Sequence, residues 1–439
     1  MNIPDRASSR TVALPSQDGG RPKLDGNVAL VSIGLALVTA FPVIPGKLQL
    51  GTVLCVVLFP FFVRTAARAL TVRILIITLI MWAVGQVIAD RVNGQGVTLT
   101  MPFILAGTIL ATTTTLTYLS CGNAHIVRFF TFGLASSFIL WDVVLGRASI
   151  SSVADWKYGL NAPVAIALLA FTDLAWRQGK RIPSFLALAA ICGIGFWSDS
   201  RGLTGIAAMT AIFFLLSRSR PRGHHPRLFF AAASMGLMLG ALSILFVDSA
   251  NAGFLGERSV AQVRQFGSNP FSIMVNARPE LYQELSLFLQ RPLTGFGSHP
   301  HLSTAAYMES LRFVQSVGVI DTASLSHYWM HLSIPGVSAH SMAADSWARA
   351  GVLAVPFWIL VVLLALWAGA TAVMFRSSPL VVMWTMLVLW DTFFSPLEIS
   401  GACFLGAYLT LAAVTITTRQ RKAGRQPSGS SQKVVKRVS

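Results

Sequence analysis

Charged residues are scarce in this chain: Asp, Glu, Lys and Arg make up only 12% of its 439 residues, whereas hydrophobic residues make up 54%. An ordinary soluble domain contains about 25% charged residues. The shortage excludes a soluble globular protein and predicts an integral membrane protein. Cysteine is scarce as well, and the four cysteines lie in or at the edges of apolar segments. No disulfide framework is therefore expected in the parts of the chain outside the membrane.

Long apolar segments recur along the chain. A bilayer core of about 30 Å needs roughly 20 apolar residues for each helical crossing, and only helices satisfy their own backbone polar groups in hydrocarbon. The sequence therefore predicts an all-α fold, a polytopic membrane helix bundle with about 12 transmembrane helices. The predicted spans are residues 27–45, 48–63, 72–90, 100–120, 128–146, 158–176, 183–198, 202–217, 228–247, 347–370, 378–396 and 399–418.

The spans divide the chain into five parts. The first apolar run is expected to be a retained signal anchor, because no small-residue cleavage site follows it. Both tails are polar, and the C-terminal tail is basic and predicted to be disordered. The expected parts are a disordered cytoplasmic tail (1–26), spans one to nine (27–247), a large outer loop with short helices (248–346), the last three spans (347–418) and a basic cytoplasmic tail (419–439).

The net charge of +17 at pH 7 is distributed unevenly between the predicted loops. With a cytoplasmic N-terminus, most Lys and Arg residues fall on the cytoplasmic side, as in the segments "RTAARALTVR", "RQGKR" and "RSRPRGHHPR". This asymmetry is typical of the positive-inside rule, so it indicates membrane orientation and not nucleic-acid binding. Both termini are predicted to be cytoplasmic.

Residues 248–346 form one external segment, and a connection of about a hundred residues is usually functional or structured. Within it, "NARPELYQELSLFLQ" places Leu281, Leu285, Phe288 and Leu289 on one face of a predicted helix. That helix either lies flat at the membrane surface or packs on the bundle. The loop also gathers polar groups, namely Arg258, Arg264, Arg278, Arg291, Arg312, Asp321, His299, His301, His327, His331 and His340. Chemistry is therefore expected at the outer face.

Three segments on the predicted outer side are notable for their order and spacing: "SDSRG" (198–202), "RPLTGFG" (291–297) and "AHSMAADSWARAG" (339–351). Together they resemble the O-antigen ligase and O-antigen polymerase superfamily of bacterial membrane enzymes. Members of that family have a Ser-Arg-Gly element opening a span, an Arg or Pro before a Gly-x-Gly turn, and His, then Asn, Ser or Gln, then nine residues and Gly. His340, Ser341 and Gly351 match the last motif, whereas Arg349 occupies a position that is commonly acidic, and Ala354 replaces a residue that is often small or hydroxylated.

The resemblance implies a glycosyltransferase of the bacterial inner membrane, with the large loop and the active face in the periplasm. The implied donor is an undecaprenyl diphosphate-linked glycan, and the acceptor is either a glycan or lipid A core, in O-antigen, lipopolysaccharide or exopolysaccharide biosynthesis. The lipid bilayer and other polysaccharide-assembly proteins are the further expected partners. The residues do not distinguish a ligase from a polymerase, since both reactions share the donor chemistry.

The site residues follow from that chemistry. Negative charge develops on the leaving diphosphate, and the sequence has no Asp-x-Asp element to hold a divalent cation. Guanidinium groups bind phosphate oxygens bidentately and stay charged, so Arg201 and Arg291 are predicted to bind the diphosphate, with Arg349 as a further candidate. Possible substrate contacts are Arg278, Arg312 and Trp347. No metal and no other cofactor is expected.

His340 is predicted to be the catalytic base. Neutral imidazole, with an ordinary pKa of about 6.5, accepts a proton from an attacking sugar hydroxyl near neutral pH. Direct attack by that hydroxyl would invert the anomeric centre. A zinc site at His327 and His331 or at the "HPH" segment is the weaker interpretation of these histidines, because no Cys or Glu completes a known pattern.

Two other classes of protein remain open from the sequence. A transporter or flippase of lipid-linked oligosaccharide would keep ionisable groups or broken helices near the midplane, often in two related halves. Here the best such feature is the Thr-rich stretch "ATTTTLT" in the fourth predicted span. A non-catalytic subunit of a polysaccharide export complex is equally compatible with the composition.

Overall fold

The computed structural model describes residues 26–44, 48–96, 101–216, 257–266, 279–300, 302–319, 341–375 and 377–424, with residues 244, 248, 252, 253 and 276. The elements of the first half are α1 (Gly26–Ala40), β1 (Pro42–Ile44), β2 (Leu48–Gln49), α2 (Leu50–Ala66), α3 (Leu70–Val92), α4 (Met101–Ser120), α5 (Ala124–Val144), α6 (Val153–Asp155), the π-helix η1 (Trp156–Leu160), α7 (Asn161–Arg177), α8 (Ile182–Trp197) and α9 (Arg201–Leu216). Those of the second half are α11 (Glu257–Phe266), α13 (Pro279–Gln290), α14 (Thr304–Ser316), α16 (Met342–Ala350), the 3₁₀ turn η2 (Gly351–Ala354), α17 (Val355–Met374), α18 (Pro379–Phe394) and α19 (Ile399–Gly424).

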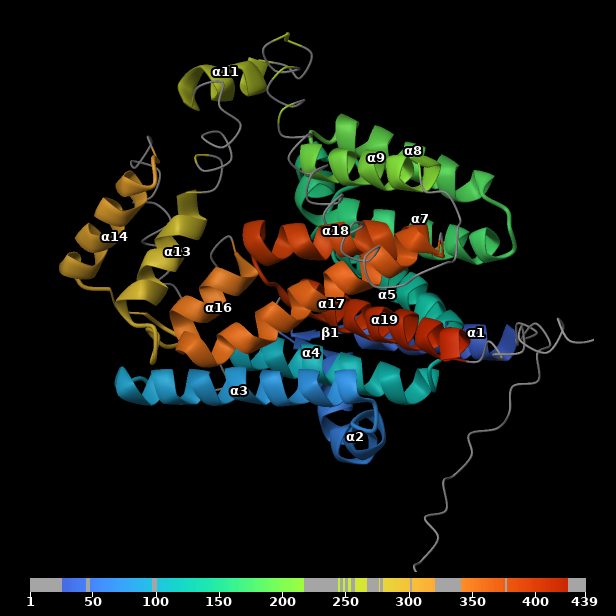
Figure 1. The fold of residues 1–439 in the computed structure, drawn as a ribbon, viewed down its shortest axis with the longest axis horizontal. Coiled ribbons are helices and arrows are strands. Elements are labelled where there is room, and N and C mark those ends of the chain that lie inside the picture. The colour runs from blue at the N-terminus through green and yellow to red at the C-terminus, as the bar shows by residue number, and fades with distance from the viewer. Residues whose placement is uncertain are drawn as a thin grey trace, which may run out of the picture.

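The described part of the chain is a helical bundle whose only strands, β1 and β2, form a short antiparallel hairpin (Figure 1). Among the described residues, five helical runs are long and apolar enough to cross a membrane: α3, α4, α5, the run from α16 through α17, and α19. The expectation of an all-α, multi-pass membrane protein is confirmed in this coarse form. The long helices form the core, and shorter helices lie within the connections between them.

The expected count of twelve transmembrane helices is not supported. Eleven of the predicted spans fall on described helices, but α1, α8, α9 and α18 have only 15 or 16 residues. A helix of that length rises about 24 Å, which is less than the roughly 30 Å of the hydrocarbon core. The ninth predicted span, 228–247, lies outside the described residues.

Helix α19 is the most enclosed of the five long apolar runs and packs against α4, α5 and α17. Its contact with α4 is close, because a Cβ at Gly406 would come within 2.8 Å of the Thr112 side chain. The hydroxyl of Thr113 donates to the Gly406 carbonyl at 3.3 Å, and the hydroxyl of Thr410 donates back to the Thr113 carbonyl at 3.4 Å. Small and hydroxylated residues commonly join helices in this way within membranes. The Thr-rich stretch therefore takes part in helix packing.

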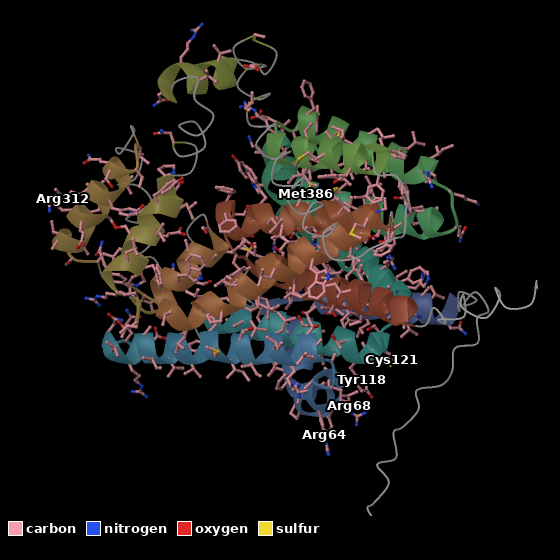
Figure 2. The ribbon with its side chains drawn as sticks, in the orientation of Figure 1. Arg64, Arg68, Tyr118, Cys121, Arg312 and Met386 are labelled. Carbon is pink, nitrogen blue, oxygen red and sulfur yellow. The ribbon has the colours of Figure 1, made fainter. Side chains whose placement is uncertain are left out.

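The outer-loop helices gather at one end of the bundle. Figure 1 shows α13, α14 and α16 together at the left, with α11 above them. Figure 2 shows Arg312 of α14 at this end, far from Arg64, Arg68 and Cys121, which lie toward the opposite side. The placement of Arg312 outside and of Arg64 and Arg68 in a cytoplasmic loop stays a prediction, since the structure contains no membrane. In Figure 1, α2 is seen nearly end-on and so crosses the direction of α3.

Candidate functional site

The Gly-x-Gly segment, residues 291–297, is bound to the end of α16 by main-chain hydrogen bonds. The Phe296 N–H donates to the Ala348 carbonyl at 2.8 Å, and the Gly297 N–H donates to the Arg349 carbonyl at 3.0 Å. In return, the Val352 N–H donates to the Pro292 carbonyl at 2.7 Å. Two motifs that lie about fifty residues apart in the sequence thus form one structural unit, which we call the outer turn junction.

Two glycines make the outer turn junction possible. Gly351 has a φ of +68°, and a Cβ there would come within 2.5 Å of the Leu293 carbonyl oxygen. Gly295 has a φ of +59°, and its Cβ would overlap the Arg349 carbonyl. Only glycine combines a left-handed φ with so close a backbone approach. The backbone contact between the two segments therefore requires both Gly351, which ends the His motif, and Gly295, the first glycine of the Gly-x-Gly turn.

A buried polar network fastens the junction to α3. Asp90 is completely buried and accepts hydrogen bonds from the Ser298 N–H at 2.6 Å, the Ser298 hydroxyl at 2.9 Å and the Gln86 amide at 3.1 Å. Arg349 is 7% exposed, donates to the Ser298 carbonyl at 2.8 Å and forms an ion pair with Asp345 at 2.7 Å. The described contacts of Arg349 thus hold the turn in place, and its predicted binding to a diphosphate stays a prediction.

Replacing Arg349 by methionine is expected to destabilise the protein by about 3 to 5 kcal/mol, because it removes one partner of a buried ion pair. The thermal midpoint of the purified protein in detergent would measure this loss. Arg312→Met is the matched control, since Arg312 is exposed on α14 and its loss should change stability by about 0.5 kcal/mol or less. Equal midpoints for the two variants would show that the network around Arg349 does not stabilise the fold.

Arg291 and Trp347 flank the junction. The exposed Arg291 guanidinium donates to the Asn93 side-chain oxygen and lies over the Phe296 ring, 4.7 Å from its centroid. The Trp347 ring packs against Phe288 of α13 at a centroid distance of 5.9 Å. Arg291 therefore keeps a solvent-accessible cation next to the turn, as binding of an anion requires. Of the other predicted site residues, Arg278 and His340 lie outside the described residues.

Arg201 is the first residue of α9 and belongs to a second charged cluster, formed by Lys157, Asp199 and Arg201. Asp199 accepts from the Lys157 ammonium at 2.9 Å through one carboxylate oxygen and from the Arg201 guanidinium at 3.1 Å through the other. The Lys157 hydrogen bond, aided by the charges of Arg201 and Lys157, lowers the pKa of Asp199 below its usual 3.8, although partial burial opposes the shift. Asp199 is therefore ionised throughout the neutral range.

Helix α18 connects this second cluster with the His motif. A Cβ at Gly202, next to Arg201, would lie 3.6 Å from the Trp390 indole. Two residues further along α18, the Thr392 carbonyl accepts a hydrogen bond from the Ser341 hydroxyl at 3.2 Å. The residue that follows His340 in sequence and the residue that follows Arg201 thus rest on the same end of α18.

The predicted site residues are consequently divided between the two ends of α16. Ser341 is at its N-terminal end, which faces the Arg201 side, whereas Arg291 and Arg349 are at its C-terminal end. With nine residues, α16 is about 13 Å long. All three motifs therefore contact α16 or α18. Arg291 and Arg349 lie at the same end of α16, whereas Arg201 lies apart from them.

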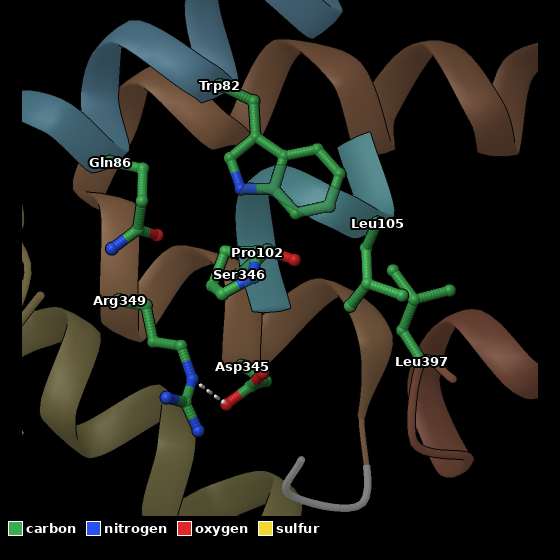
Figure 3. A pocket seen from close by; sticks show the side chains of 8 residues that line it. All are labelled: Trp82, Gln86, Pro102, Leu105, Asp345, Ser346, Arg349 and Leu397. Carbon is green, nitrogen blue, oxygen red and sulfur yellow. Dashed lines mark hydrogen bonds and ion pairs between the residues drawn. The ribbon is translucent and has the colours of Figure 1, made fainter. Parts of the chain in front are cut away.

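A small recess, with room for about one water molecule, lies beside α16 between α3, α4 and residue 397 (Figure 3). The side-chain oxygen of Gln86 is buried there and has no hydrogen-bond partner among the described residues. Trp82 forms an apolar wall, and Ser346, Asp345 and Arg349 supply polar groups. A single water molecule would satisfy this acceptor. The residues that line the recess are Trp82, Gln86, Pro102, Leu105, Asp345, Ser346, Arg349 and Leu397.

Helix α13 confirms the helix expected over "NARPELYQELSLFLQ", but it turns its polar side inward. Glu280, Gln283 and Glu284 are buried, whereas Leu289 of the predicted apolar stripe is exposed. The inward side packs against α14 and α16, and the Ser310 hydroxyl of α14 donates to the Ser286 hydroxyl at 3.1 Å. Leu281, Leu285 and Phe288 of the stripe are half-buried, and Phe288 packs against Trp347, so these contacts favour the alternative in which the helix packs on the bundle.

Sequence reasoning missed Asp90 and Lys157. Asp90 ends one predicted apolar span and Lys157 directly precedes another, and charged residues at such positions usually mark only a span boundary. In the structure both bind groups that belong to recognised motifs, namely Ser298 after the Gly-x-Gly turn and Asp199 before Arg201. No family model matches this chain, and no curated protein matches it.

Proposed function

We propose that this protein is an inner-membrane glycosyltransferase that transfers a glycan from an undecaprenyl diphosphate carrier to an acceptor sugar hydroxyl. The observation that carries the proposal is the outer turn junction, in which Gly295 and Gly351 meet backbone to backbone. This contact gives a physical reason for the two separate motifs on which the resemblance to the O-antigen ligase and polymerase superfamily rests. A chance match of short motifs would not require their glycines to touch.

In the proposed reaction, the acceptor hydroxyl attacks the anomeric carbon and the diphosphate leaves with the carrier lipid. Arg201 balances the charge that develops on the diphosphate, and His340 takes the proton of the attacking hydroxyl. Arg291, at the other end of α16, is a separate candidate for binding the diphosphate. The reaction needs no metal ion, inverts the anomeric centre and takes place at the periplasmic face. Arg278, Arg312 and Trp347 are proposed to contact the substrates.

The acceptor is a second glycan if the enzyme is a polymerase, or lipid A core if it is a ligase. The recess beside α16 has room for about one water molecule, so it does not hold a sugar and does not distinguish the two acceptor classes. Both acceptor classes carry sugar hydroxyls. Their identity therefore has to be established by experiment.

Reconstitution of the purified protein in liposomes tests the proposal. Undecaprenyl diphosphate-linked glycan is supplied with either lipid A core or a second carrier-linked repeat, and the expected result is a new glycosidic product that forms equally well in chelator. Movement of the carrier-linked glycan across the bilayer without any new bond would show a flippase instead. Deletion of the gene then separates the two enzymes: core capped with a single repeat indicates a polymerase, and long chains left on the carrier indicate a ligase.

A further inference from the structure

We propose that Lys157 and Arg201 form a two-cation clamp for the diphosphate of a polyprenyl lipid, with Asp199 holding the two cations in register. The inference rests on the proposed function of Arg201 and extends it to a residue that no motif contains. In this proposal the diphosphate of the carrier lipid binds where η1, α8 and α9 meet. The three charged residues are called the Lys157 clamp below.

The charges of the clamp do not cancel. Lys157 and Arg201 each carry one positive charge, and Asp199 carries one negative charge that it divides between them through separate oxygens, at 2.9 and 3.1 Å. These three side chains together carry a net charge of +1, and they lie where α9 begins, so the positive end of the helix dipole adds to it. An anion that approaches Lys157 and Arg201 is therefore attracted by both cations and by the end of the helix.

Several contacts fix the clamp independently of its charges. Asp199 has a φ of +52°, a left-handed conformation that is uncommon for residues with a side chain but that Asp adopts more readily than most. The adjacent Ser198 hydroxyl accepts from the buried Asn161 amide at 2.6 Å, and the Trp156 and Trp197 rings meet edge to face at 5.7 Å. The loop of Asp199 and the π-helix of Lys157 are thus held against each other by packing. A pair of mobile surface charges would lack this support.

The clamp is accessible, and apolar surface surrounds it. The side chains of Lys157 and Arg201 are 24% and 28% exposed, so both heads are desolvated in part but can be reached. Tyr158, Phe196 and Trp197 next to them are exposed large aromatic residues. Exposed aromatic residues of this kind gather where the hydrocarbon of a bilayer meets its headgroups. A lipid whose diphosphate lies at this depth can place its phosphates on the clamp and its chain in the bilayer.

The two cations differ in a way that suits a diphosphate. A guanidinium binds two oxygens of one phosphate as a planar fork, whereas an ammonium acts as a compact point charge with three donors. One group can therefore bind each of the two linked phosphates. Because the pKa of Asp199 is held below its usual range by Lys157 and Arg201, the carboxylate stays charged and keeps the two heads apart.

Direct binding tests the clamp without reference to catalysis. The probe is undecaprenyl diphosphate without sugar, and its dissociation constant is measured on the full-length protein in lipid nanodiscs. Lys157→Gln is expected to weaken binding about tenfold or more, as for loss of a charge-assisted hydrogen bond, and Lys157→Arg is expected to restore most of it. Lys180→Gln is the matched control, because Lys180 is an exposed lysine just beyond the other end of α7 and should leave binding unchanged.

The remaining outcomes are distinguishable. If Arg201→Gln weakens binding but Lys157→Gln does not, Lys157 is only a counter-ion of Asp199 and the clamp is wrong. If free pyrophosphate competes as strongly as the lipid, the site does not recognise a lipid carrier. If the carrier binds through Lys157 but the wild type never transfers a glycan, the clamp stands and the proposed function fails. A thermal midpoint for each variant within a few degrees of the wild type shows that the folded protein was tested.

Discussion

Replacing His340 by alanine is expected to lower the rate of glycan transfer by about 10² to 10⁴-fold, which is the usual contribution of a positioned general base. The reason is that the acceptor hydroxyl would lose the group that takes its proton, whereas the donor diphosphate would still be bound by cations elsewhere. Turnover in the reconstituted liposome assay measures the rate. Binding of undecaprenyl diphosphate by the same variant should stay within about twofold of the wild type, since catalysis and ground-state binding are separate quantities.

Ser341→Ala, a change at the residue next to His340, separates loss of stability from loss of catalysis. The Ser341 hydroxyl accepts the Ala344 N–H at 3.1 Å as the N-cap of α16 and donates to the Thr392 carbonyl, so its loss should destabilise the fold by about 1 kcal/mol.

His299→Ala tests the metal interpretation of the "HPH" segment and should leave chelator-resistant turnover in place. Wild-type turnover by His340→Ala, or loss of turnover only in parallel with loss of folded protein, would remove the proposed base.

Replacing Gly351 by alanine is expected to destabilise the protein by roughly 2 to 4 kcal/mol more than the same change at Gly94. Both glycines have a φ of +68°, and Gly351 combines it with a ψ of −159°, a conformation that essentially only glycine adopts. Their surroundings differ as well, because a Cβ at Gly94 would meet nothing within 4 Å, whereas a Cβ at Gly351 would meet the Leu293 carbonyl at 2.5 Å. The comparison therefore measures the backbone conformation of Gly351 and its close contact together.

Thermal midpoints and limited proteolysis of the two variants measure this difference. Proteolysis should open the segment around residue 293 in Gly351→Ala but not in Gly94→Ala, because only the former loses its contact with α16. Glycan transfer by Gly351→Ala should fall with the release of the turn, even under conditions where the bundle remains folded. Equal midpoints for the two variants would mean that the junction forms without the close backbone contact.

The positions of the helices could be predicted from apolar runs, because burial in lipid requires long stretches of uncharged residues. The division between α16 and α17 could not. The tenth span was expected over 347–370, but α16 ends at Ala350 and α17 begins only at Val355. The run Met342–Met374 is long and apolar enough to count as one candidate span, so hydropathy does not show that Gly351 leaves the helical conformation within it. The break depends on a tertiary contact with Leu293, which no local pattern contains.

The same distinction applies to the site. The motifs indicated Arg201, Arg291 and His340 because their spacing is written in the chain. The partners Asp90 and Lys157 could not be predicted, because their roles arise from contacts with residues 208 and 42 positions away. Arg349 shows the converse: its position suggested a ligand for phosphate, and the structure shows it donating to the Ser298 carbonyl.

The outer turn junction also restricts how the site can be altered. The hydrogen bonds between its two segments join main-chain atoms, from Phe296 to Ala348 and from Val352 to Pro292. Buried side chains of Asp90 and Arg349 then fasten it through Ser298. An engineer who wishes to redirect acceptor choice should therefore leave positions 90, 295, 349 and 351 unchanged and vary exposed neighbours such as Leu293.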